Sequence, residues 1–111
     1  MLLAAPGVNL ALANGNGWTP LMFACRHGHD DIVDLLLRAG ASANQRAYDG
    51  ATALYIAAQN GHAAAATRLL RAPGIDVSLT PRNGFTPLRV AQETGRAAVV
   101  AALLAHARQS S

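Results

Sequence analysis

The hexapeptide Asn16-Gly-Trp-Thr-Pro-Leu21 recurs as Asp49-Gly-Ala-Thr-Ala-Leu54 and again as Asn83-Gly-Phe-Thr-Pro-Leu88, at spacings of 33 and 34 residues. The same offset relates three Gly-containing pairs and three Leu-Leu pairs: Gly28-His29, Gly61-His62 and Gly95-Arg96, then Leu36-Leu37, Leu69-Leu70 and Leu103-Leu104. A fixed period of this length indicates a stack of repeated units, in which each unit buries apolar surface against its neighbours.

Each copy carries the signals of a first short helix. A threonine stands where its hydroxyl can cap the helix start, and proline follows it in two of the three copies, at Thr19, Thr52 and Thr86. Apolar residues then recur at i, i+3 and i+4, as Leu21, Ala24 and Cys25 and as Leu54, Ala57 and Ala58. Gly28, Gly61 and Gly95 are predicted to end these helices.

A second helix is predicted to begin at Asp30. Its expected apolar stripe is Ile32, Leu35 and Leu36. Two aspartates at its start and Arg38 near its end suit the helix dipole, and Gly40 ends it. The segment 40–50 is rich in small and turn-forming residues, which predicts an extended hairpin between successive helix pairs.

Length and composition favour one packed domain. The chain has 111 residues, of which 51% are hydrophobic and 5% aromatic. Much of the apolar content is alanine, which lets short helices approach one another closely. Such a composition excludes a disordered tail.

These linked motifs resemble the ankyrin repeat. The resemblance rests on the Gly-x-Thr-Pro-Leu opening, the Gly-His turn, the Leu-Leu pair and the closing Gly40-Ala-Ser-Ala-Asn44, over essentially the whole chain. It implies an all-α solenoid of helix-turn-helix units joined by β-hairpin-like loops. We expect a single domain over 1–111, divided into a partial repeat at 1–13 and repeats at 14–46, 47–80 and 81–111.

The chain departs from the family pattern at two positions of each repeat. The family's histidine after Thr-Pro-Leu is replaced by Met22, Tyr55 and Arg89, and its hairpin aspartate by Asn14, Ala47 and Pro81. The hydrogen bonds that the family forms at these positions are therefore not expected here. The residues that set the geometry remain, so the fold prediction stands.

The N-terminal segment is interpreted as the end of an earlier repeat, because Leu2-Leu-Ala-Ala-Pro-Gly7 matches Leu69-Leu-Arg-Ala-Pro-Gly74. It lacks the basic start of a signal peptide. At the other end, residues 97–105 are almost wholly alanine, valine and leucine. Since terminal repeats need a polar outer face, we expect either a fragment of a longer array or ends that contact another chain.

Several function classes are disfavoured by the sequence. All nine basic residues are arginines spread along the chain, with a net charge of +3, whereas nucleic-acid binding needs a clustered basic face. We expect no membrane contact, because no apolar run is long enough for a span. Cys25 is the only cysteine, which favours a reducing, cytoplasmic location and a buried structural thiol.

No chemistry is predicted for the polar residues of the first helix pair. His27, His29, Asp30 and Asp31 resemble metal ligands in type, but they fall in the repeat's turn and helix start. The run Asn14-Gly-Asn-Gly17 lacks the strand and lysine of a phosphate loop. We therefore expect no enzyme activity, no metal and no cofactor.

The resemblance implies a protein-binding surface along the hairpin tips and the exposed side of each first helix. We call this predicted surface the ridge. Its residues are Asn16, Trp18, Arg26, His27, Arg46, Tyr48, Asp49, Gln59, Asn60, Arg82, Phe85 and Glu93. Trp, Tyr and Arg are the residue types that dominate binding energy at protein interfaces.

Three ridge residues keep two interpretations. Trp18 and Phe85 either contact a partner or pack over the next hairpin, since each stands where the middle repeat has Ala51. Arg46 either contacts a partner or only solvates the ridge. Tyr48, at a true tip, is the stronger candidate for binding.

The expected function is recognition of a protein partner, of unknown identity, through the concave side of a rigid array. Two alternatives remain: a self-associating element whose apolar ends join chains into a homo-oligomer, and a regulatory segment of a larger multidomain protein.

Overall fold

The structure is a computed structural model that describes residue 15 and residues 17–110. Six helices follow one another in this part of the chain: α1 (Pro20–His27), α2 (Asp30–Arg38), α3 (Ala53–Asn60), α4 (Ala63–Leu70), α5 (Pro87–Glu93) and α6 (Ala97–Ser110). No strand occurs among the described residues. The all-α repeat fold predicted from the period is confirmed.

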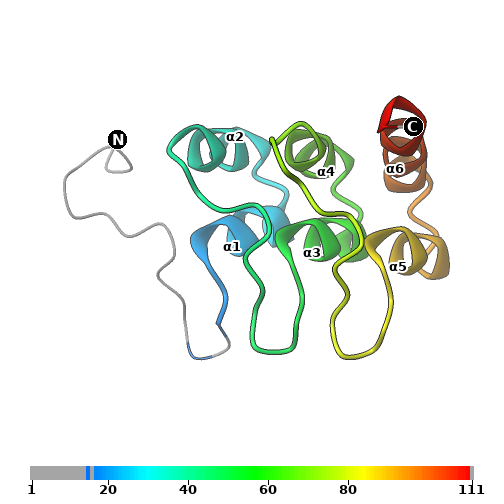
Figure 1. The fold of residues 1–111 in the computed structure, drawn as a ribbon, viewed down its shortest axis with the longest axis horizontal. Helices are drawn as coiled ribbons and strands as arrows, with labels where there is room; N and C mark the ends of the chain where they lie inside the picture. Colours follow the sequence, from blue (N-terminus) through cyan, green and yellow to red (C-terminus); the bar gives the residue numbers. More distant parts are fainter. Residues whose placement is uncertain (1–14, 16, 111) are drawn as a thin grey trace.

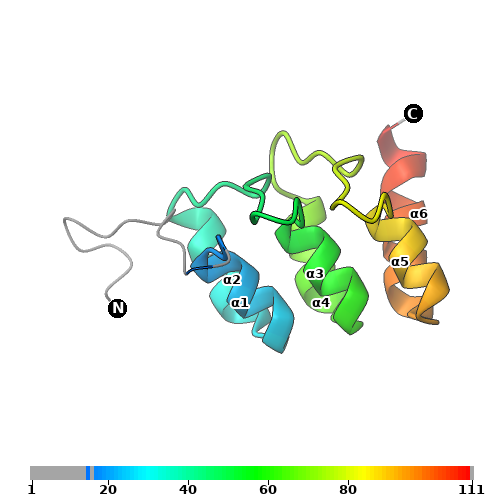
Figure 2. The ribbon, with the colours of Figure 1, turned by 90° about the horizontal axis from the view of Figure 1, so that it is seen from below.

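The helices form two layers (Figure 1). One layer contains α1, α3 and α5 and the other contains α2, α4 and α6, and each helix packs on its partner and on the equivalent helix of the next pair. The loops between pairs extend away from the helices and line up along one edge of the array (Figure 2). The predicted partial repeat at 1–13 lies outside the described residues.

The predicted helix starts are confirmed. The hydroxyls of Thr19, Thr52 and Thr86 accept hydrogen bonds from the backbone N–H three residues later, at 3.4, 3.2 and 3.1 Å. Gly28 and Gly61 end α1 and α3 with φ of 70° and 75°, the left-handed conformation that glycine adopts without steric cost. In the third repeat the prediction is off by one residue, because α5 is capped by Thr94 in front of Gly95. Local chemistry therefore sets the ends of α1 and α3.

The core lies between the two layers, and it confirms most of the predicted stripes. All six stripe residues of α1 and α3 are buried, namely Leu21, Ala24, Cys25, Leu54, Ala57 and Ala58. Alanine occupies much of this core, so the helices of adjacent repeats lie close together.

The apolar stripe predicted for α2 is wrong in two of its three members. Leu36 is buried together with Val33, whereas Ile32 and Leu35 are 42% and 37% exposed. Ile32 faces the outer side of the first described pair, while its equivalents Ala65 and Val99 are buried between pairs. Helical spacing identifies an apolar side but not which neighbour covers it.

Candidate functional site

The hairpin tips present three exposed ridge residues. Tyr48 is 70% exposed, and Asp49 and Arg82 are exposed beside it. The backbone N–H of Arg82 donates to the carbonyl of Asp49 at 2.9 Å, which joins two successive hairpins. The Asp49 carboxylate accepts from the backbone N–H of Ala51 at 3.0 Å, so the turn holds its orientation. These side chains lie on a fixed backbone and have no role in the core.

Arg46 links the same two hairpins through its side chain. Its Nε donates to the carbonyl of Gly50 at 3.2 Å, and its Nη2 donates to the carbonyl of Thr80 in the next hairpin. Both acceptors are neutral, so the positive charge of Arg46 stays uncompensated by these bonds. The residue therefore has a structural contact and still carries charge at the ridge.

The ring of Trp18 contacts Phe23 and Arg26 of its own repeat. Its half-buried ring is 5.2 Å from the ring of Phe23, and the guanidinium of Arg26 lies 5.7 Å from the indole centroid. A guanidinium at this distance from an indole makes a cation–π contact. Trp18 and Arg26 thus form one aromatic and basic cluster on α1 and the loop before it.

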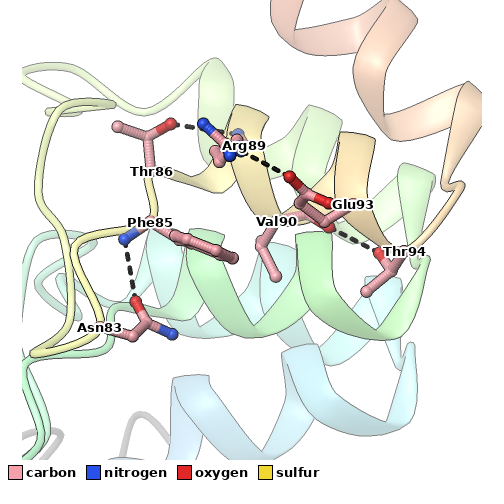
Figure 3. A network of polar contacts seen from close by, with 7 residues as sticks. All are labelled: Asn83, Phe85, Thr86, Arg89, Val90, Glu93 and Thr94. Atoms are coloured by element: carbon pink, nitrogen blue, oxygen red, sulfur yellow. Dashed lines mark hydrogen bonds and ion pairs between the residues drawn. The ribbon is translucent and has the colours of Figure 1, made fainter.

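Phe85 repeats this arrangement in the last repeat (Figure 3). The guanidinium of Arg89 lies 5.2 Å from its ring, and the Nε of Arg89 donates to the carboxylate of Glu93 at 2.8 Å. Asn83 fixes the turn, since its side-chain oxygen accepts from the backbone N–H of Phe85 at 2.9 Å. The ridge therefore has an aromatic ring with a guanidinium near each end of the described array.

The remaining ridge residues occupy two surroundings. Gln59 is exposed on α3, and the side chain of Asn60 donates to the carbonyl of Ile56 in the same helix at 2.8 Å. His27 lines an apolar groove at the first end of the described array, away from the hairpin tips. Asn16 lies outside the described residues.

That groove has a volume of about 360 Å³ and is formed by α1 and α2. Phe23 and Ile32 line it and are 40% and 42% exposed. Their equivalents in α3 and α4, Ile56 and Ala65, are 2% and 0% exposed, because the preceding helix pair covers them. Phe23 was not among the predicted site residues, although it is aromatic where the other two repeats have the aliphatic residues Ile56 and Val90.

The three residues that replace the family's histidine form contacts of their own. Met22 accepts from the backbone N–H of Thr19 through its sulfur, at 3.4 Å. The hydroxyl of Tyr55 accepts from the side-chain amide of Asn83 in the next repeat, at 2.8 Å. Arg89 forms the ion pair with Glu93. All three residues at this position therefore form polar contacts, although none of them is a histidine.

The Cys25 thiol is buried in the core and is not exposed to a substrate. Burial raises the pKa of the Cys25 thiol to about 12, so the thiol stays protonated and is a poor nucleophile. Among the described residues, no three His, Cys, Asp or Glu side chains are grouped closely enough to hold a metal ion. Within the same residues, no helix has the length and apolar character needed to cross a membrane.

Comparison with known proteins identifies the family of this chain. A family model described as "Ankyrin repeats (3 copies)" matches residues 1–81 and 47–110. The chain is 40% identical over 80 residues to alpha-latrotoxin-Lg1a of Latrodectus geometricus, covering 71% of this chain and 6% of that protein. It is 36% identical over 98 residues to Protein fem-1 homolog A-like of Mus musculus, covering 86% and 14%. The chain thus spans a small part of these relatives, and it belongs to the ankyrin-repeat family.

Proposed function

We propose that this chain binds a protein partner through the ridge. Ankyrin repeats are in general protein-interaction modules. The observation that carries the proposal is the set of exposed side chains on hairpins that are bonded to one another: Tyr48, Asp49 and Arg82 extend from a backbone fixed by the Arg82–Asp49 bond and by Arg46.

Rigidity supports this role. A surface that is already ordered loses little conformational entropy when it binds, so fewer contacts are needed for a given affinity. The tyrosine ring adds a large contact area with few rotatable bonds. The proposal gives the chain a recognition role and assigns it no catalytic step.

The test compares capture of proteins from a lysate of the source cells by three forms of the chain. The unmodified chain is compared with a Tyr48→Ala, Arg82→Ala variant and with an Asp31→Ala, Arg71→Ala control, whose two residues are exposed on the second helix layer. Circular dichroism verifies that all three are folded. We expect specific partners to be retained by the control and lost from the ridge variant. Retention of every partner by the ridge variant would refute the proposal.

A second candidate is contact through the first end of the array. The exposed apolar groove at Phe23 and Ile32 favours it, because the equivalent positions of later repeats are covered by a helix pair. At the other end, α6 also exposes apolar side chains, among them Ala98, Ala101 and Leu104.

Light scattering over a dilution series tests self-association through this groove. The candidate requires a molar mass that rises with concentration and returns to the monomer value in an Ile32→Asp variant. A constant monomer mass at all concentrations rules out self-association. The third role, a regulatory segment of a larger multidomain protein, is supported by the small part of the relatives that this chain spans.

A further inference from the structure

The hairpin tips of the second and third described repeats form a groove of about 510 Å³. Arg46, Tyr48 and Asp49 line it from one hairpin, and Thr80 and Arg82 line it from the next. The groove lies between the last two hairpins of the described array, and its lining includes the ridge residues Arg46, Tyr48, Asp49 and Arg82. Its polar groups are specific enough to suggest the chemistry of a ligand.

Gly50 leaves the space between the two hairpins free of a side chain. A Cβ atom at this position would lie 3.0 Å from the Cα of Pro81 and 3.2 Å from Nη2 of Arg46. The φ of Gly50 is 89°, which also disfavours any other residue. The close approach of the hairpins and the position of the Arg46 guanidinium both depend on this glycine.

The two guanidinium groups give the groove its charge. Arg46 is oriented by two neutral carbonyls, and Arg82 is exposed. The ion pairs found among the described residues involve neither of them. Asp49 is the one carboxylate that lines the groove, and the nearby carboxylate of Asp76 is bonded to Ser78. The lining therefore has an excess of positive charge.

Tyr48 provides an aromatic wall beside these charges. Its ring lies against Gly17 of the preceding hairpin, where a Cβ atom would be 2.8 Å from Cδ1 of the tyrosine. This contact positions the ring while 70% of the residue stays exposed. A ring held in this way can pack against the aliphatic part of a bound side chain.

We propose that the groove binds an extended acidic segment of the partner protein, with one carboxylate paired to Arg46 and Arg82 and its methylene groups against Tyr48. Guanidinium groups bind carboxylates through paired hydrogen bonds. Asp49 disfavours a ligand that brings several negative charges to this point, such as a nucleic-acid backbone. The inference rests on the proposed function, because it names the partner chemistry recognised by the same ridge.

NMR titration of the ¹⁵N-labelled chain tests the inference with two synthetic peptides. One peptide contains glutamates separated by alanine, and the other has glutamine at the same positions. We expect the acidic peptide to shift the amide signals of Tyr48, Asp49, Gly50 and Arg82, and the glutamine peptide to leave them unchanged. Raising the salt concentration should weaken the binding. Equal shifts with both peptides would overturn the proposal.

Two variants separate a specific site from the effect of net charge. Arg82→Gln should weaken the acidic peptide about tenfold, since one charge-assisted contact is lost. Arg71→Gln removes the same charge near α6 and should leave the affinity unchanged. Equal weakening by both variants would show attraction by net charge alone and overturn the site. Tighter binding of a single-stranded oligonucleotide at the same signals would also overturn it.

The peptide titration and the lysate capture distinguish a failure of the acidic-ligand inference from a failure of the proposed function. If Arg82→Gln does not affect the acidic peptide but the Tyr48→Ala, Arg82→Ala variant loses its cellular partners, the ridge binds and the acidic specificity is wrong. If that variant keeps every partner, the proposed function itself is wrong.

Discussion

The imidazole of His62 lies over Gly28 of the preceding repeat, with its Nε2 2.8 Å from the carbonyl oxygen of Arg26. A carbonyl only accepts hydrogen bonds, so Nε2 carries the proton. Arg96 repeats this contact one unit later, where its Nε donates to the carbonyl of Gln59 at 3.2 Å. The residues that follow Gly61 and Gly95 thus each satisfy a free carbonyl at the end of the previous repeat's first helix.

Gly28→Ala should therefore destabilise the fold more than a glycine substitution in open space. A Cβ at Gly28 would lie 2.6 Å from Nδ1 of His62, in addition to the strain of its positive φ. Gly74→Ala is the matched control, since Gly74 has a φ of 76° and nothing within 4 Å.

Left-handed backbone costs about 1–2 kcal/mol in either variant. Gly28→Ala should lose roughly 1 kcal/mol more, the net contribution of one hydrogen bond. Urea denaturation followed by circular dichroism measures both free energies of unfolding. Equal losses would mean that the His62 contact contributes nothing.

Asn44→Ala should also weaken the array, because Asn44 joins two successive connectors. Its side-chain amide donates to the carbonyl of Gly74 at 2.8 Å, and its oxygen accepts from the backbone N–H of Asp76 at 2.9 Å. Losing both bonds should lower the free energy of unfolding by about 1–2 kcal/mol. Gln45→Ala, at the exposed neighbouring position, is the control and should change it little. Similar results for the two variants would contradict the bridging role.

The helix caps and turn glycines were predictable because each depends on residues within one turn of the chain. Thr52 caps α3 through the N–H of Tyr55, a contact fixed by a spacing of three residues. The error at Ile32 has the opposite origin. Its exposure depends on whether another helix pair lies beside α2, and no local pattern contains that information.

Only part of the ridge could be predicted from the sequence, because some of its contacts depend on how neighbouring repeats pack. The exposed position of Tyr48 follows from its place in the hairpin, but its contact with Gly17 depends on how two repeats pack. The link from Arg46 to the carbonyl of Thr80 spans 34 residues and was not expected. Sequence offers no signal for a side chain that bonds a backbone carbonyl of the following repeat.

Cys25 should be protected from thiol reagents in the folded chain. The pKa of its thiol is raised to about 12 by burial, so at about pH 8 the reactive thiolate is nearly absent. Ellman's reagent should therefore modify one thiol per chain in guanidinium chloride and almost none in native buffer. Rapid reaction of the native chain would show that the site opens to solvent.

The same pKa shift predicts a pH dependence of stability. Below the ordinary thiol pKa of about 8.5 the folded and unfolded thiols are both neutral, and the stabilising effect of burial is fully present. As the pH rises from there towards 12, the unfolded thiol ionises first and the fold loses stability. Cys25→Ala, which copies Ala58 of the next repeat, should remove this part of the pH dependence. If the stability of Cys25→Ala depends on pH as that of the unmodified chain does, groups other than this thiol cause the dependence.

Asp76 should titrate below an ordinary aspartate. The side-chain and backbone hydrogen bonds from Ser78 lower its pKa, and the positive charge of Arg46 adds a smaller effect in the same direction. A lowered pKa means that the folded state favours the carboxylate. Its contribution to stability is therefore present above the ordinary aspartate pKa of about 3.9 and is lost as the pH falls through the folded value.

Carboxyl ¹³C NMR should show the pKa of Asp76 returning towards the ordinary value in Ser78→Ala, with a smaller rise in Arg46→Gln. A pKa that moves more in Arg46→Gln than in Ser78→Ala would reverse the assigned causes.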